Sequence, residues 1–396
     1  MQVVPQTPNT NIKIDIVTEK GITDSQIVTL EDVQRGVVPL HMPANGGEIR
    51  ISGASLRQIE KMNPQTVLVL QSDGATMSVP ITELSAKVYS QQFNVTEDDI
   101  RFHFIVHSPD ASIESAVEQA VNRIEAQKLG PAIVFEIQVT GENGRTAFIS
   151  TFNRYVTRTL TLPGDTVPAT ATGVWWVTES NEFHYVPTYF EKKNGKWVAV
   201  MKRQGASLYT VINRPVTFDD VHNHWGKAPI ELLASKLIIE GRSKNAFAPD
   251  APITRAEVAS LLVRALGLAP SETKSPFTDI SGGWYEQAVN MAYRAGLVSG
   301  YEDGTFRADQ SVTREELVQM IVGAMNYTEV KPEGKDRNTV FTDAGMIAEW
   351  AHQAVNKASE TGIIDGEGMF RPTSLSTRAE TAAMLERMLK LVKFIQ

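Results

Sequence analysis

The sequence predicts a multidomain protein in which a β-rich α+β region precedes an all-α region built from repeats. Before residue 214 the apolar residues recur with a period of two, which is typical of strands. After residue 216 one set of landmark residues recurs three times in the same order. We expect a linker at residues 1–11 and the β-rich region at residues 12–214, which either forms one unit or divides into two modules near residue 108.

Composition and charge exclude several classes of function. The formal net charge is −8 and the basic residues form no patch, so nucleic acid is not an expected partner. The chain has no cysteine, which removes disulfides, thiol nucleophiles and Cys-ligated zinc. Its apolar runs are only strand-sized, so we expect no membrane insertion. The first residues carry no export signal, and we expect the chain to be a piece of a longer exported precursor.

One helix is expected among the strands of the β-rich region. Between Ala111 and Leu129 apolar residues recur on one helical face, and Gly130-Pro131 follows. The strands are expected at residues 67–70, 100–106, 132–139, 155–162, 173–178 and 197–201.

The all-α region contains three repeats, at residues 216–275, 276–338 and 339–396. Each repeat begins with Phe-x-Asp, in which the aspartates are Asp220, Asp279 and Asp343. A tryptophan then heads an apolar-periodic run, at Trp225, Trp284 and Trp350. A glycine turn and a second apolar run follow, so each repeat is predicted to form a helix, a turn and a helix.

The end of the first helix differs between the repeats. Gly296 and Gly362 stand where a left-handed C-terminal cap favours glycine. Leu237 occupies this place in the first repeat, so we expect that helix to end differently. The turns that follow begin at Gly241, Gly300 and Gly366.

The second helix of each repeat opens with Thr-Arg-x-Glu, which is a capping box. In this motif the Thr side chain accepts a hydrogen bond from the backbone N–H of the Glu, and the Glu carboxylate accepts one from the N–H of the Thr. We assign a structural capping role to six residues: Thr254, Glu257, Thr313, Glu316, Thr377 and Glu380.

Capping does not explain the arginine of this motif, which stands at Arg255, Arg314 and Arg378. A cation in the first turn opposes the helix dipole by roughly 0.3 to 1 kcal/mol. Together with free N–H groups at the helix start, the guanidinium would form an anion site that suits a carboxylate. Alternatively, each arginine pairs with the aspartate of Phe-x-Asp. The tryptophans leave a similar choice between stacking on a sugar ring and packing in the core.

These landmarks resemble the S-layer-homology repeat, and the resemblance covers about residues 216–396. In that family three repeats form a pseudo-threefold trimer of helical units, and grooves between them bind secondary cell wall polysaccharide that often carries pyruvate ketals. The resemblance implies that Arg255, Arg314 and Arg378 contact the pyruvate carboxylate. It also implies that the grooves are shaped by Asp220, Asp279, Asp343, Trp225, Trp284 and Trp350.

The function implied by the resemblance is non-covalent anchoring of a surface protein to the bacterial cell wall. We expect an extracellular location in the cell wall or S-layer, and self-association in a surface lattice. The alternative is a surface-attached glycan-active enzyme or adhesin whose N-terminal region carries the activity.

Catalysis has little support in the sequence itself. The seven histidines form no zinc motif, and neither a nucleophile elbow nor a phosphate-binding glycine loop is present. We predict that the protein is not an enzyme and that it holds no metal and no cofactor.

The three repeats are expected to form unequal grooves. Two additional residues separate Phe341 from Trp350, and Glu315 places a negative charge beside Arg314. Because the third repeat has a shifted tryptophan and lacks the hydrophobic staple at Ser376 and Thr381, Arg255 and Arg314 rank before Arg378 as expected ligand contacts.

Overall fold

The computed structural model describes residues 11–18, 21–43, 47–178, 180–269, 273–332, 341–365 and 368–396, and the side chains of residues 22 and 23 are not described. Three predicted features lie outside these residues: the linker apart from residue 11, the turn glycine Gly366, and the boundary between residues 338 and 339.

Two β-sheets form the N-terminal region. Within the described residues the larger sheet has ten strands in the order β13-β12-β16-β9-β7-β4-β1-β2, with β10 beside β9 and β8 beside β16. Its strands are β1 (Ile12–Thr18), β2 (Gly21–Val28), β4 (Glu48–Ser52), β7 (Ile100–His107), β8 (Gln127–Lys128), β9 (Ile133–Gly141), β10 (Thr146–Phe148), β12 (Ala171–Val177), β13 (Glu182–Val186) and β16 (Ser207–Asn213).

The smaller sheet has six strands in the order β14-β15-β11-β6-β5-β3 in the part of the chain described. β3 pairs with β5 in parallel, and β5 continues into an antiparallel pair with β6. The strands are β3 (Val37–His41), β5 (Val67–Ser72), β6 (Ala75–Pro80), β11 (Thr151–Thr161), β14 (Thr188–Lys193) and β15 (Lys196–Gly205).

A single apolar cluster lies between the two sheets. Leu68 and Met77 of the smaller sheet belong to the same buried cluster as Phe102 and Ile137 of the larger one. Along β9 buried and half-buried residues alternate, which is the period that directs every second side chain to the core. β7 and β9, on either side of residue 108, pair along their length, and the division near that residue stays a prediction.

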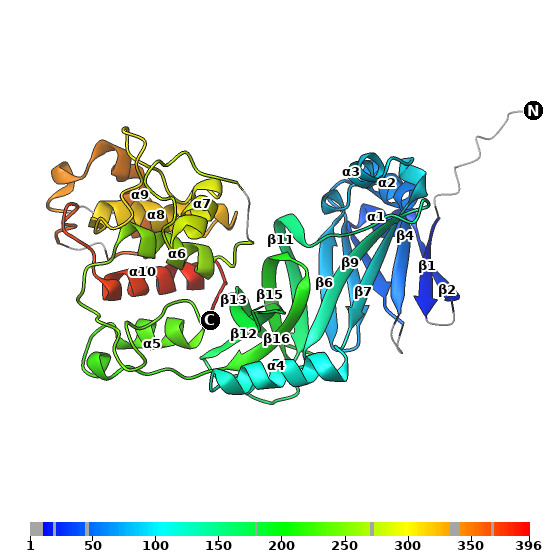
Figure 1. Ribbon diagram of the computed structural model, residues 1–396, viewed down its shortest axis with the longest axis horizontal. Coiled ribbons are helices and arrows are strands. Elements are labelled where there is room, and N and C mark those ends of the chain that lie inside the picture. The colour runs from blue at the N-terminus through cyan, green and yellow to red at the C-terminus, as the bar shows by residue number, and fades with distance from the viewer. Residues whose placement is uncertain are drawn as a thin grey trace, which may run out of the picture.

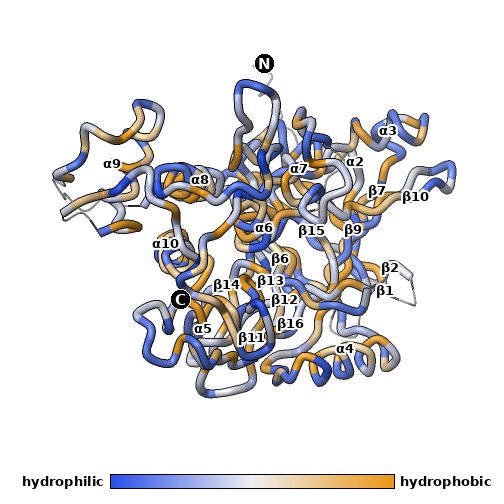
Figure 2. The backbone as a smooth tube through the Cα atoms, turned by 60° about the vertical axis from the view of Figure 1, so that its left-hand side comes forward, coloured by the Kyte–Doolittle hydropathy of each residue, from blue (hydrophilic) through white to orange (hydrophobic). Residues whose placement is uncertain are grey.

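Helices accompany the sheets of the N-terminal region. α4 (Ala111–Arg123) packs its apolar face on β12 and β16, and its tube alternates between hydrophobic and hydrophilic stretches (Figure 2). It ends six residues before the predicted end at Leu129, because Gln127 and Lys128 pair with β16 instead. The other elements are α1 (Leu30–Gln34), α2 (Gly53–Met62), α3 (Ala86–Phe93), η1 (Ile81–Glu83) and η2 (Glu97–Asp99).

The C-terminal region is helical and lies beside the end of the sheets that carries β12, β13 and β15 (Figure 1). The prediction of a β-rich region followed by helical repeats is therefore confirmed. Each repeat supplies two α-helices: α5 (Lys227–Ser235) and α6 (Arg255–Ala265), α7 (Glu286–Arg294) and α8 (Arg314–Tyr327), α9 (His352–Glu360) and α10 (Arg378–Leu391). Single 3₁₀ turns precede some of them: η3 (Asp219–Val221), η4 (Ala344–Met346) and η5 (Glu349–Ala351).

The first helices of all three repeats end in the same way. Gly296 and Gly362 have φ values of 68° and 75°, as the glycine caps require, and Leu237 adopts 61°. The expectation that the first repeat ends differently is wrong. A left-handed conformation costs a residue with a Cβ roughly 1 to 2 kcal/mol. Leu237 packs against the apolar clusters of both the repeats and the sheet, and this burial offsets the strain.

The β-rich region and the repeats share a buried interface. The hydroxyls of Tyr155 and Tyr185 donate to the backbone oxygens of Leu266 and Phe394, each at 2.7 Å. Tyr185 is 1% exposed and belongs to the apolar core of the repeats. The two regions are therefore packed as one body rather than joined by a free linker. No helix in the described part of the chain is both long and apolar enough to span a membrane.

A buried lysine at this interface predicts a pH-dependent stability. Lys236 is 1% exposed, and its Nζ donates to the backbone oxygen of Ala171 at 2.6 Å. Burial lowers the pKa of Lys236 to about 8, and the charge of Lys390 adds to this effect. In the unfolded chain a lysine titrates near about 10.4. Folding therefore disfavours the proton, so the contribution of this group to stability rises as the pH increases from about 8 towards 10.4.

Lys236→Met is expected to raise the free energy of unfolding at pH 7 by about 1 to 2 kcal/mol, because it removes a buried cation. The difference from the wild type should shrink as the pH rises above 8. Urea denaturation at pH 7, 9 and 10 measures it. A difference that stays constant over this range would contradict the assignment.

Candidate functional site

The second helices of the three repeats begin beside one another. Short β-bridges join Pro252 to Thr377, Thr254 to Ser311, and Thr313 to Leu375. The first N–H of each helix donates to a backbone oxygen of another repeat: Arg255 to Gln310 at 2.9 Å, Arg314 to Ser374 at 2.9 Å and Arg378 to Ala251 at 3.0 Å. The N–H groups that were expected to be free for an anion are therefore occupied by the neighbouring repeat.

A capping box is present at each of these helix starts. Thr313 accepts from the N–H of Glu316, and the carboxylate of Glu316 accepts from the N–H of Thr313 at 2.9 Å. Thr254 with Glu257, and Thr377 with Glu380, make the same pair of bonds. Both bonds join residues only three positions apart, so the motif itself fixes where each helix begins.

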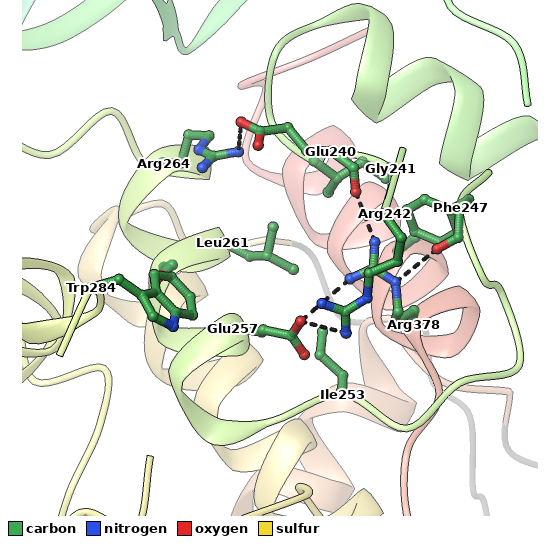
Figure 3. Close-up of a pocket in the computed structure, with 13 residues that line it drawn as sticks. Glu240, Gly241, Arg242, Phe247, Ile253, Glu257, Leu261, Arg264, Trp284 and Arg378 are labelled. Atoms are coloured by element: carbon green, nitrogen blue, oxygen red, sulfur yellow. Dashed lines mark hydrogen bonds and ion pairs between the residues drawn. The ribbon is translucent and has the colours of Figure 1, made fainter. Parts of the chain in front are cut away.

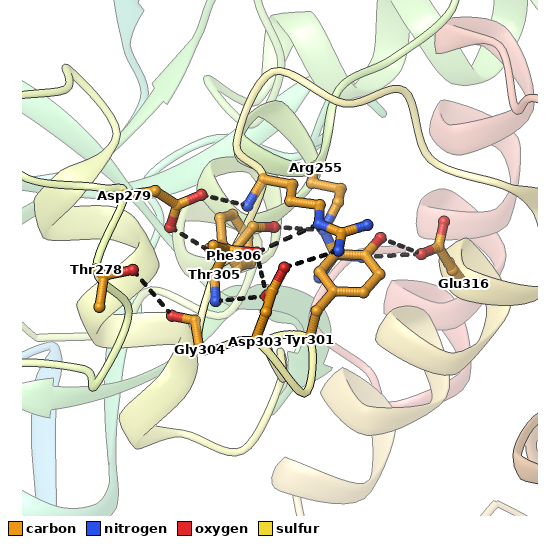
Figure 4. Close-up of polar contacts among 10 residues, drawn as sticks. Arg255, Thr278, Asp279, Tyr301, Asp303, Gly304, Thr305, Phe306 and Glu316 are labelled. Carbon is orange, nitrogen blue, oxygen red and sulfur yellow. Dashed lines mark hydrogen bonds and ion pairs between the residues drawn. The ribbon is translucent and has the colours of Figure 1, made fainter.

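The guanidinium of Arg255 reaches into the second repeat (Figure 4). Its Nε donates to the backbone oxygen of Phe306 at 2.9 Å, and Nη2 donates to that of Ser299 at 2.8 Å. Nη1 forms an ion pair with the capping glutamate Glu316 at 3.1 Å. The Arg255 side chain is only 7% exposed. This arginine holds the turn and the second helix of the next repeat.

Arg378 makes the corresponding contacts from the third repeat to the first. Its Nε donates to the oxygen of Phe247 at 3.0 Å and Nη2 to that of Glu240 at 2.7 Å, and Nη1 lies 3.7 Å from Glu257. Arg314 reaches from the second repeat to Glu380 of the third at 3.0 Å. The exposed fractions of these side chains are 9% for Arg378 and 22% for Arg314. Burial lowers the pKa of both arginines.

The aspartates of Phe-x-Asp bind backbone rather than arginine. Asp279 accepts from the N–H groups of Phe306 and Arg307, both at 2.8 Å. Asp220 and Asp343 bind the corresponding pairs of N–H groups in their own repeats. Although burial raises the pKa of Asp343, the N–H groups of Phe370 and Arg371 outweigh it and the pKa is lowered. Each aspartate thus fixes the turn of its own repeat.

The three tryptophans are exposed. The exposed fractions are 63% for Trp225, 70% for Trp284 and 54% for Trp350, so none is a core residue. Trp284 and Trp350 each line a groove between repeats. Exposed indoles are available for contact with a ligand, as sugar stacking requires.

Two grooves run between repeats, and each takes residues from all three. The repeat-1 groove, of about 170 Å³, lies over the turn at residues 239–247 and α6, and is completed by Trp284 and Arg378 (Figure 3). The repeat-2 groove, of about 880 Å³, lies over the turn at residues 300–307 and α8, and is completed by Arg255 and Trp350. The equivalent surface of the third repeat includes residues 366 and 367, which lie outside the described residues.

The residues that follow the turn glycines were not among the predicted site residues. The hydroxyl of Tyr301 donates to Glu316 at 2.9 Å, and the guanidiniums of Arg255 and Arg307 lie 4.8 and 3.8 Å from the centre of its ring. In the first repeat Arg242 takes this place and lies 2.6 Å from Glu257. Both residues directly follow the turn glycine, and the sequence gives no sign that their side chains contact the capping glutamates.

Glu315, the neighbour of Arg314 in the sequence, binds the backbone of the third repeat, and its effect on anion binding at Arg314 stays a prediction. The Glu315 side chain is buried, and its carboxylate accepts from the N–H of Ala348 at 3.0 Å. It thereby holds the start of η5, beside the segment in which the third repeat has two additional residues.

Repeated helical units that bind one another's turns and share grooves define a class of tandem-repeat module. Residues 217–259, 276–318 and 340–382 match the S-layer homology domain. The C-terminal part of the chain therefore consists of three S-layer homology domains, and the resemblance seen in the sequence is confirmed.

Proteins similar to this chain include surface proteins and enzymes. It is 30% identical over 174 residues to S-layer protein sap of Bacillus anthracis, covering 43% of this chain and 21% of that protein. It is 31% identical over 264 residues to an amylopullulanase of Thermoanaerobacterium thermosulfurigenes, covering 65% of this chain and 14% of the relative. It is 36% identical over 187 residues to exoglucanase XynX of Acetivibrio thermocellus, covering 46% and 17%. The chain spans less than a fifth of the length of these two enzymes.

These comparisons confirm cell-surface anchoring and a location at the cell surface, because the S-layer homology domains match those of an S-layer protein. They overturn the prediction that the protein is not an enzyme. An amylopullulanase and an exoglucanase are among the relatives, which points to an enzyme. The chain covers only 14% and 17% of these two relatives, so the activity itself is a proposal.

Arg255→Ala is expected to lower the free energy of unfolding by about 3 to 5 kcal/mol, because it leaves Glu316 and two backbone oxygens without their partner. Arg314→Ala should cost about 1 kcal/mol, since its ion pair is more exposed. Urea denaturation measures both, with Arg35→Ala, at an exposed pair with Asp32, as the control. Equal losses in Arg255→Ala and Arg35→Ala would rule out the buried contact as a source of stability.

Proposed function

We propose that the three repeats close into a pseudo-threefold body that anchors the protein by binding secondary cell wall polysaccharide in the grooves between repeats. The observation that supports this most is the cyclic order of the arginine contacts. Arg255 reaches from repeat 1 to repeat 2, Arg314 from repeat 2 to repeat 3, and Arg378 from repeat 3 to repeat 1. A closed order of this kind generates one groove at each junction.

In this proposal the exposed tryptophans stack on sugar rings at the groove edges. Trp284 and Trp350 line grooves whose other walls belong to different repeats. A ligand in either groove would therefore contact residues of all three repeats. Trp225 is the equivalent residue for the third groove. Asp220, Asp279 and Asp343 act indirectly, by holding the turns that form the walls.

A pyruvate ketal would present its carboxylate to the arginines. Arg314 is the most exposed of the three, at 22%, so we infer that it is the first to contact the ligand. Arg255 and Arg378 chiefly position the walls, because their donors are bound to the next repeat. This order differs from the one expected from the sequence. Self-association in a surface lattice stays a prediction.

Repetition of the site strengthens the anchor. One hydrogen-bonded arginine–carboxylate pair contributes roughly 1.5 to 3 kcal/mol, which by itself gives weak binding. Several grooves on one polymer raise the apparent affinity by about 10² to 10⁴-fold through effective concentration.

We expect the chain to sediment with cell wall sacculi and to lose this binding when mild acid extraction removes the polysaccharide. Replacing both Trp284 and Trp350 by Ala should reduce the bound fraction strongly, because it removes two stacking surfaces. Phe148→Ala is the matched control, since this exposed aromatic lies on β10 in the β-rich region and lines neither groove. Retention on extracted peptidoglycan would overturn the polysaccharide assignment.

A second proposal concerns activity: the protein is a glycan-degrading enzyme held at the cell surface by its repeats. The supporting observation is that two relatives, 31% and 36% identical over part of this chain, are named amylopullulanase and exoglucanase. The buried interface at Tyr155 and Tyr185 would then hold the β-rich region against the repeats.

The activity is tested by incubating the full chain with amylopectin and with β-glucan and measuring reducing ends. Release that is abolished by one Asp or Glu substitution in the β-rich region, with unchanged wall binding, is the expected result for activity in these residues. No release from either glucan would contradict it.

A further inference from the structure

We propose that the two described grooves select different parts of the polymer. The repeat-2 groove takes an uncharged sugar residue and the repeat-1 groove takes an acidic one, with Gly323 as the residue that creates the difference. This inference rests on the proposed polysaccharide binding. It is carried by one position of the repeat, by the sizes of the grooves and by the charges that line them.

The position lies ten residues after the capping threonine. In the first repeat it is Arg264, whose Nη1 donates to Ile238 O at 3.3 Å and binds Glu240 at 2.8 Å. In the third repeat Arg387 makes the same contacts, with Ile363 O at 3.2 Å and Asp365 at 3.1 Å. The second repeat has Gly323 instead, and Ser299 replaces the acid. Both members of the ion pair are therefore missing in one repeat.

Loss of this side chain contributes to the larger size of the repeat-2 groove. Gly323 lines a groove of about 880 Å³, whereas Arg264 lines one of about 170 Å³. Packing does not require the glycine, because an added Cβ would meet its nearest neighbour, Gly296 O, at an ordinary 3.6 Å. A glycine inside a helix such as α8 costs about 1 kcal/mol relative to alanine. A residue that weakens its helix and relieves no clash is explained by the space it opens.

The charged residues that line the two grooves also differ. Three arginines and two glutamates line the repeat-1 groove: Arg242, Arg264, Arg378, Glu240 and Glu257. Two arginines and three carboxylates line the repeat-2 groove: Arg255, Arg307, Glu302, Asp303 and Glu316. The first set has a positive excess and the second a negative one. An anionic sugar is attracted to the repeat-1 groove and repelled from the repeat-2 groove.

The remaining lining agrees with this division. In the repeat-2 groove Arg307 is bound to Asp303 at 3.0 Å, and Met320 and Trp350 offer an apolar wall for the C–H face of a sugar. The carboxylates accept hydrogen bonds from neutral hydroxyls. The repeat-1 groove holds the hydroxyl of Ser260, which is buried and has no hydrogen-bond partner in the described part of the chain.

The test uses two sugars that share a ring and differ by one carboxylate, N-acetylglucosamine and N-acetylmuramic acid. The indole N–H signals of Trp284 and Trp350 in the ¹⁵N-labelled full chain report each groove separately. N-acetylglucosamine is expected to shift the Trp350 signal, and N-acetylmuramic acid the Trp284 signal. The proposal is overturned if both sugars shift the same indole or if N-acetylglucosamine leaves Trp350 unshifted.

Substitutions test the role of Gly323. Gly323→Arg should weaken N-acetylglucosamine binding at Trp350 by about tenfold or more, while Gly323→Ala, the matched control, should stay within about twofold. Arg264→Ala opens the repeat-1 groove in a different helix and should let N-acetylglucosamine shift Trp284, so the proposal is testable even if Gly323→Arg does not fold. Unchanged binding in Gly323→Arg, or no new shift in Arg264→Ala, would overturn it.

Wall sedimentation distinguishes this inference from the anchoring proposal. If the wild type sediments with sacculi but the two indoles respond alike, the division between grooves fails and anchoring stands. If the wild type does not sediment at all, the anchoring proposal fails, whatever the indole signals show.

Discussion

The reach of one arginine from each repeat into the next is the interaction on which the C-terminal architecture depends. A cation in the first turn of a helix is unfavourable where it stands. It is retained because the guanidinium satisfies carbonyl groups of the neighbouring turn and the glutamate that caps the neighbouring helix. Arg255 does this with Ser299, Phe306 and Glu316. One side chain thereby joins two repeats, a turn and a helix start.

The grooves are a consequence of this joining. Each groove is lined mainly by one repeat and completed by residues of the other two, so no groove is complete until the repeats are held together. The turns that form the walls are held in turn by the aspartates of Phe-x-Asp, and the residue after each aromatic takes a left-handed conformation, with φ of 60° at Ala248, 56° at Arg307 and 59° at Arg371. The arginine and aspartate contacts thus stabilise the repeats and also shape the grooves. Among the described residues the exposed tryptophans make no such contacts and are free to bind a ligand.

The sequence predicted what is local and missed what is distant. The starts of α6, α8 and α10 follow from the capping box, whose partners lie three residues apart. The partners of the arginines could not be predicted, since Ser299 lies 44 residues from Arg255 and Glu240 lies 138 residues from Arg378. The order of the ten-stranded sheet is non-local in the same way. The end of α4 was misplaced because pairing with β16 outweighed helical periodicity. Leu237 was misjudged because burial offsets its backbone strain.

A double-mutant cycle on Arg255 and Glu316 tests this account most directly. Arg255→Ala, Glu316→Gln and the double variant are unfolded with urea, and the loss of the cap contact at Thr313 cancels in the cycle. The account predicts a coupling free energy of about 1 to 3 kcal/mol between two residues that stand 61 positions apart. A coupling near zero would show that the arginine does not hold the repeats together.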